Sequence, residues 1–175
     1  MTRLLPFVIV LLAATASAEA ADVRVTPVVR EGRVWISCSI ADGFTPELRD
    51  AIRSGLSITF TYDIELRRTV PIWPDRTLTV ATVAVSVTYD SLTRRHQLER
   101  IVDGRIQATK VTEDEAEVRK WLTGLESLPI FATSQLEANT EYYIRVRART
   151  QPHDSVVFWP WDRGLSVNTP FTFIP

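Results

Sequence analysis

Apolar and polar residues alternate along most of the chain after residue 20, and this period of two is typical of β-strands with one buried face. The segments that show the alternation cover residues 23–29, 34–40, 56–66, 77–89, 94–102, 105–111 and 143–149. Glu31-Gly32 separates the first two segments, and Asp103-Gly104 is a two-residue hairpin signal before the sixth. The pattern predicts a mainly β protein with an antiparallel meander.

Two short helices are predicted to interrupt the strands, and each has boundary signals. Thr45 is an N-cap residue followed by Pro46 at the first helical position, and Gly55 is the stop signal. The segment 112–115 has the form of a capping box that opens the second helix. The residues expected to face a core from this helix are Trp121, Leu122 and Leu125. Each helix is short enough to cover an end or an edge of a sheet.

The last alternating segment is preceded by a turn that has a known counterpart. Residues 136–142 run from Leu136 through a turn to Tyr142, and they resemble the strand entry of fibronectin type III domains, where a tyrosine corner ties a loop to the sandwich. Ala138 stands where that pattern has proline. The resemblance implies an immunoglobulin- or fibronectin-III-like antiparallel β-sandwich of about seven to nine strands, here with two short helices. It implies nothing about function.

Charged residues gather on the polar faces of two predicted strands. Asp63, Glu65 and Arg67 share one face, and the other carries Tyr143, Arg145, Arg147 and Arg149. Paired carboxylates can act as acid and base in glycoside cleavage. The simpler interpretation is a solvent face on which charges form cross-strand ion pairs. The row from Tyr143 to Arg149 is also able to receive an acidic segment of a partner.

Two predicted loops carry large aromatic residues where loops are normally polar. The first, 70–75, contains Trp73; the second, 156–162, contains Phe158, Trp159 and Trp161. Prolines stiffen both loops, and a stiff aromatic loop can contact a partner or stack on a sugar at a low ordering cost. The alternative is that these aromatic residues close the open end of the sandwich as part of its core.

Composition excludes several classes of function. The 20 Lys and Arg residues nearly balance the 21 Asp and Glu residues, so we expect no nucleic-acid partner. The single cysteine, Cys38, lies on an apolar strand face and is predicted to be a buried thiol. The two histidines, His96 and His153, lack ligand spacing, and the motifs H-E-x-x-H, C-x-x-C, G-x-S-x-G and S-x-x-K do not occur. We therefore predict no catalytic, cofactor or metal site, and a protein that is not an enzyme.

The first twenty residues follow a different pattern from the rest. Arg3 is followed by an apolar run over 4–14, and Ala16-Ser17-Ala18 and Ala18-Glu19-Ala20 are overlapping A-x-A cleavage motifs. The run contains Pro6 and is shorter than the about 20 residues that span a bilayer. We expect residues 1–20 to be a secretory signal peptide cleaved at one of the two motifs. Residues 21–175 are then a single periplasmic or secreted β-sandwich domain with no stable membrane span.

Three separate segments carry a resemblance over most of the chain after the signal. They are Glu65-Leu66-Arg67-Arg68 with Trp73 and Asp75, then Tyr89–Arg95, then Leu136–Tyr142 with the arginine strand. In these segments the chain resembles a family of exported bacterial proteins known as domain of unknown function 4390. The resemblance implies a periplasmic protein of Gram-negative type and brings no activity or catalytic residues with it.

These observations lead to one functional prediction and two alternatives. The prediction is a non-catalytic binding or adaptor module that engages an envelope protein through Trp73 and the 158–161 loop, with the arginine strand as a secondary surface. The first alternative is a glycan-binding or hydrolytic protein with a cleft near Asp63, Glu65 and Asp75, which requires the carboxylates to line a concave pocket. The second is an assembly factor that offers an uncovered edge strand.

Overall fold

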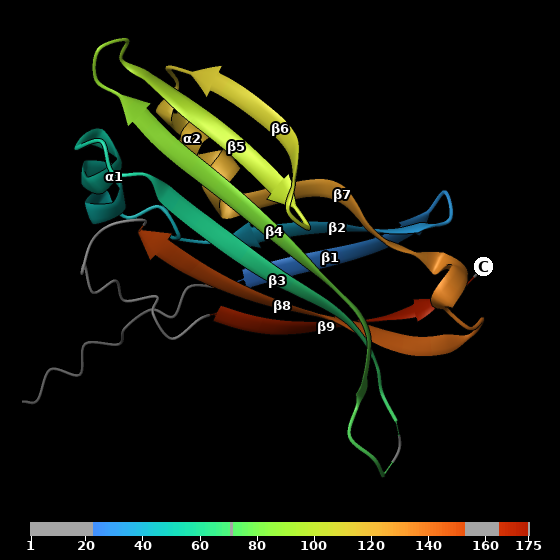
Figure 1. Ribbon diagram of the computed structural model, residues 1–175. Coiled ribbons are helices and arrows are strands. Elements are labelled where there is room, and N and C mark those ends of the chain that lie inside the picture. The colour runs from blue at the N-terminus through green and yellow to red at the C-terminus, as the bar shows by residue number, and fades with distance from the viewer. Residues whose placement is uncertain (1–22, 71, 153–164, 175) are drawn as a thin grey trace, which may run out of the picture.

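The computed structural model describes residues 23–70, 72–152 and 165–174, and in these ranges nine strands form two antiparallel sheets (Figure 1). The smaller sheet has the order β1-β2-β7 and the larger sheet the order β6-β5-β4-β3-β8-β9. The strands are β1 (Val23–Arg30), β2 (Arg33–Ile40), β3 (Ile58–Arg68), β4 (Arg76–Asp90), β5 (Arg95–Val102), β6 (Arg105–Thr112), β7 (Gly124–Ala132), β8 (Thr140–Pro152) and β9 (Leu165–Phe173). The predicted mainly β sandwich with two short helices is confirmed.

The core lies between the two sheets and is built by the alternating strands. β3 buries Ile58, Phe60, Tyr62, Ile64 and Leu66, while the intervening residues face away from the core. A strand places successive side chains on opposite faces, so this alternation assigns one face of β3 to the core and leaves the other for polar groups. Cys38 of β2 is buried as predicted, and burial raises the pKa of its thiol to about 12.

The first helix has the predicted boundaries. α1 (Pro46–Arg53) begins after Thr45, whose hydroxyl accepts a hydrogen bond from the backbone N–H of Leu48 at 3.3 Å. The chain leaves the helix through Gly55, whose φ of 90° lies in the left-handed region that glycine adopts without a steric cost. Leu48 and Ile52 are buried, so the helix is held by its apolar face.

The second helix begins later than predicted, and the capping box at 112–115 is wrong. α2 (Glu115–Thr123) is capped by Asp114, whose carboxylate accepts from the N–H of Ala116 at 2.8 Å. Thr112 is the last residue of β6 because it pairs with His96 of β5, and its hydroxyl accepts from the N–H of Asp114. Leu122 faces the core as predicted, Trp121 is only half-buried, and Leu125 is buried as part of β7.

The predicted tyrosine corner is formed at the entry to β8. Tyr142 is buried, and its hydroxyl accepts a hydrogen bond of 2.9 Å from the backbone N–H of Glu137, five residues upstream. Asn139 provides the turn with a φ of 54°, and its N–H donates to the carbonyl of Phe173 at the end of β9. These bonds fix where β8 starts and therefore which of its residues face outward. The wider resemblance to fibronectin type III domains stays a prediction.

Candidate binding surface

The turn that joins β3 to β4 projects away from the sandwich (Figure 1). Two of its apolar side chains are exposed. Ile72 is fully exposed, and 74% of the Trp73 surface is accessible. Trp73 is therefore not part of the core, and the alternative interpretation of this residue as a plug for the open end of the sandwich is wrong. Phe158, Trp159 and Trp161 of the second aromatic loop lie outside the described residues, as does His153.

Asp75 fastens the base of this hairpin to β8. Its Oδ2 accepts a hydrogen bond of 2.7 Å from the hydroxyl of Tyr143, and its Oδ1 accepts from the N–H of Val70 at 3.4 Å. Arg67 donates to the carbonyl oxygen of Asp75 at 2.9 Å. Because the Tyr143 hydrogen bond stabilises the charged carboxylate, it holds the pKa of Asp75 below its ordinary value, and the cations Arg67 and Arg145 act in the same direction. Burial raises the pKa of Tyr143, with the hydrogen bond to Asp75 as the second cause. The tip is thus presented on an ordered base, which lowers the entropic cost of binding through it.

Ile72 has a backbone conformation that does not suit its side chain. Its φ is 72°, in the left-handed region where a β-branched residue is a steric outlier. Burial of the side chain does not offset this steric cost, since the side chain is fully exposed. An apolar residue kept at a strained and solvated position favours a contact made outside this chain.

Replacing Ile72 with asparagine is expected to leave the free energy of unfolding unchanged or to raise it by up to about 1 kcal/mol, because asparagine tolerates this φ better. Urea unfolding followed by circular dichroism measures the change. A loss of more than about 1 kcal/mol would show that the Ile72 side chain packs against the protein itself.

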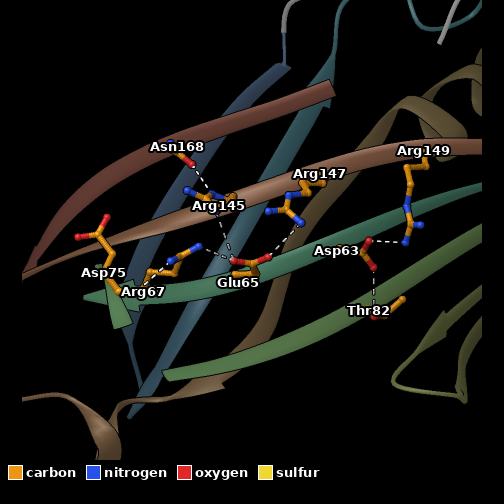
Figure 2. Close-up of polar contacts among 9 residues, drawn as sticks. All are labelled: Asp63, Glu65, Arg67, Asp75, Thr82, Arg145, Arg147, Arg149 and Asn168. Atoms are coloured by element: carbon orange, nitrogen blue, oxygen red, sulfur yellow. Dashed lines mark hydrogen bonds and ion pairs between the residues drawn. The ribbon is translucent and has the colours of Figure 1, made fainter. Parts of the chain in front are cut away.

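Figure 2 shows the charged groups on the outer face of β3 and β8. We call Arg145, Arg147 and Arg149 of β8 the arginine row. Glu65 lies among three guanidinium groups: Arg67 Nη1 at 3.2 Å, Arg147 Nη1 at 3.6 Å and Arg145 Nη1 at 3.9 Å. Arg149 pairs with Asp63, which also accepts from the hydroxyl of Thr82 at 3.4 Å. The predicted cross-strand ion pairs on this face are therefore present.

These ion pairs are offset along the strands. In the β3–β8 register Glu65 is opposite Arg145 and Asp63 is opposite Arg147. The shortest cross-strand contact of Glu65 is nevertheless with Arg147, and Asp63 pairs with Arg149. Each of these arginines lies two residues farther along β8 than the residue directly opposite the carboxylate. Arg145 instead donates its Nε–H to Asn168 of β9 at 3.0 Å. Asn168 is a contact that the sequence analysis missed, because the predicted strands do not include β9, although its residues alternate in burial.

A shallow hollow of about 270 Å³ lies between the base of the hairpin and the arginine row, and its lining includes Asp75, Tyr143, Arg145 and Asn168. Of the three carboxylates considered for catalysis, only Asp75 lines it, since Asp63 and Glu65 lie outside its lining. The three carboxylates thus do not share this hollow, and each of them is engaged by a hydrogen bond or an ion pair.

Other chemical sites were assessed only within the part of the chain that the structure describes. No group of three or more His, Cys, Asp and Glu side chains is arranged there to hold a metal ion. His96 is buried, with its ring centroid 4.8 Å from that of Tyr89. None of the described helices is long and apolar enough to cross a membrane.

The edge strands of the two sheets differ in whether they contain proline, which has no N–H to donate to a further strand. β1 contains Pro27, β7 contains Pro129 and β9 contains Pro170, whereas β6 contains none. β6 also exposes Ile106 and Val111. A register shift interrupts the pairing of β6 with β5, and β6 also carries the basic residues Arg105 and Lys110. Bulges and charged side chains protect an edge strand from pairing with a further strand. β6 is thus the described edge that best fits strand addition, and it is partly protected.

Residues 16–154 match a family model described as "Domain of unknown function (DUF4390)". The matched range contains the β3–β4 hairpin and the arginine row and ends two residues after β8, so β9 lies outside it. No curated protein and no solved structure matches the chain.

Proposed function

The chain belongs to the DUF4390 family of domains of unknown function, and from the geometry we propose that it is a non-catalytic binding module that engages a protein of the cell envelope. The contact is the tip of the β3–β4 hairpin, with Ile72 and Trp73 as its anchors. The envelope location is part of the proposal and rests on the signal-like pattern of residues 1–20.

The observation that carries this proposal is the exposure of Ile72 and Trp73 on a projecting turn whose base is fixed. Burying a large apolar side chain in a partner contributes about 1.5–3 kcal/mol, and tryptophan is among the residues that most often dominate an interface. Hydrogen bonds to Asp75 order the base of the turn before binding, so little of that gain is lost to ordering.

The state of the carboxylates supports a non-catalytic role over glycan hydrolysis. A glycosidase needs one carboxyl group that stays protonated, with a raised pKa, and a second that is ionised. The pKa of Asp75 is lowered, chiefly by the Tyr143 hydrogen bond, and Asp63 and Glu65 are in ion pairs with arginine. Each of the three carboxylates is thus already engaged by a hydrogen bond or a guanidinium group.

Strand addition at β6 is the second candidate, because β6 is the described edge strand without proline. It ranks below the hairpin because the register shift and the two basic residues oppose pairing. The two candidates place the contact on different elements of the larger sheet, so a position-specific crosslink separates them.

Trp73→Ala is expected to lower capture of the partner at least about tenfold, since the variant loses a buried aromatic anchor. The measurement is in-cell photo-crosslinking with the crosslinking residue placed at position 72, followed by identification of the captured protein. Leu92→Ala is the matched control: Leu92 is 93% exposed at the β4–β5 turn, at the other end of β4, and its loss is expected to leave capture unchanged.

Two results would contradict the proposal. Equal capture by the native protein and by a folded Trp73→Ala variant would remove the hairpin tip from the interface. A discrete crosslink from position 106 with none from position 72 would favour strand addition at β6 instead. Thermal unfolding of each variant checks that a loss of capture is not a loss of fold.

A further inference from the structure

The outer face of β3 and β8 has more guanidinium groups than carboxylates on its strands. Arg67 and the arginine row supply four cations, and Asp63 and Glu65 supply two anions beside them (Figure 2). Glu141 adds a third anion at the hairpin end of β8. Asp75 adds a fourth carboxylate at the hairpin base, where it is already held by Tyr143 and Val70. Glu141 and Asp75 both lie toward the hairpin end, so the positive charge on β8 is concentrated farther along the strand, at Arg145, Arg147 and Arg149.

Two arginines of this row make no hydrogen bond to a carboxylate. Arg149 forms an ion pair with Asp63. Glu65 accepts a hydrogen bond from Arg67. Arg147 lies 3.6 Å and Arg145 3.9 Å from Glu65, which is beyond ordinary hydrogen-bond length. The Arg147 side chain is half exposed and donates no hydrogen bond to any described residue, and Arg145 uses only its Nε, toward Asn168. Arg145 and Arg147 thus retain Nη donors for an external acceptor.

The spacing of these donors indicates the shape of that acceptor. Outward residues of a strand that are two positions apart are separated by about 6.6 Å. An extended peptide has the same repeat, so a segment lying along β8 with acidic residues at every second position meets Arg145 and Arg147 in turn. Carboxylates also match the planar, bidentate donor pattern of arginine.

The direction of the segment follows from the order of charges along β8. The outward residues from the hairpin end are Glu141, Tyr143, Arg145 and Arg147, so the surface is acidic and aromatic near the tip and basic beyond it. Glu141 and Asp75 line the same hollow as Arg145 and would repel carboxylates there. The acidic residues of a partner therefore lie over Arg145 and Arg147, and its apolar residues lie toward Trp73.

We propose that Arg145 and Arg147 bind an acidic, extended segment of the same protein partner, one that places two carboxylates two residues apart along β8. The proposal rests on the proposed binding function and names the chemistry of the partner next to the hairpin contact. The hollow lined by Asp75 and Arg145 joins the two contacts into one surface.

A labelled ten-residue peptide of alternating Asp and Thr is the probe, and fluorescence anisotropy at low salt measures its binding. The double variant Arg145→Gln, Arg147→Gln is expected to weaken binding at least about tenfold, because each lost charge-assisted hydrogen bond is strong. The double variant Arg33→Gln, Arg105→Gln is the matched control, since it removes two exposed strand arginines elsewhere, and binding is expected to stay within about twofold.

A gain of affinity provides the second test. Glu65→Gln removes the internal anion that competes for Arg145 and Arg147 while keeping a side chain of similar shape, and it is expected to tighten peptide binding by about threefold or more. Raising the salt concentration to about 0.5 M is expected to weaken binding of the native protein, since exposed charges are screened.

Several outcomes overturn the inference: equal binding of an Asn-Thr peptide, an unchanged affinity in the Arg145, Arg147 variant, or binding to phosphatidylglycerol vesicles with none to the peptide. The last result would assign the row to phosphate. If capture in cells still requires Trp73 but the affinity for the peptide does not depend on Arg145 and Arg147, the binding function stands and this inference fails. If the arginine row binds the peptide but the Trp73→Ala variant captures the partner as well as the native protein does, the hairpin proposal fails instead.

Discussion

Replacing Leu122 with alanine is expected to lower the free energy of unfolding by about 3 kcal/mol. Leu122 is fully buried on α2, and the Tyr62 hydroxyl donates a 2.5 Å hydrogen bond to its backbone carbonyl. The smaller sheet has three strands and the larger sheet has six. Helix α2 contacts the larger sheet at β4, β5 and β6 (Figure 1). The truncated side chain would leave a cavity at the point where helix and sheet meet.

Urea unfolding measures this change, and Leu92→Ala is again the control because it is the same truncation at an exposed position. We expect Leu92→Ala to change the free energy of unfolding by less than about 0.5 kcal/mol. If Leu122→Ala lowers the free energy of unfolding by less than about 1 kcal/mol, the packing of α2 against β4–β6 does not contribute to the core as described.

Replacing Glu65 with alanine is expected to lower the free energy of unfolding by about 2 kcal/mol, between the values for exposed and for buried ion pairs. The Glu65 side chain is 13% exposed, and its removal leaves Arg67, Arg145 and Arg147 near one another without their shared anion. Because the remaining repulsion is electrostatic, we expect the loss to shrink as salt is added.

Glu137→Ala is the matched control for Glu65→Ala. Glu137 also pairs with one arginine, Arg68, at 2.6 Å, but its side chain is 65% exposed, so its loss is expected to cost clearly less than the loss of Glu65. Equal effects of the two substitutions, measured by urea unfolding at low salt, would show that Glu65 does not organise the charged face.

Some features of the site follow directly from the sequence. The outward direction of Arg145, Arg147 and Arg149 is predictable because Ile144, Val146 and Ala148 alternate with them and are apolar. Ion pairs on this face are predictable as a class, since opposite charges occupy the polar faces of two predicted strands. Their partners are not predictable, because they are offset by two residues from the strand register.

β7 and the start of α2 escaped prediction, one because its pattern is irregular and the other because of a competing partner. β7 lacks a clean period of two because its pairing with β2 shifts register twice and Ser127 has a φ of 43°. The start of α2 was misplaced because the capping signal of Thr112 competes with its pairing to His96 in the sheet. In both cases a contact distant in sequence outweighs a local preference.

The sequence by itself determined the fold class, the buried face of β3, the limits of α1 and the tyrosine corner, because each depends on side-chain periodicity or on hydrogen bonds between residues close in the chain. Only the tertiary structure decided that Trp73 stands in solvent, that Asp75 anchors the hairpin to Tyr143, and that Glu65 is shared by three arginines. These facts depend on which strands become neighbours, and that is settled by the packing of the whole core rather than by any local stretch of residues.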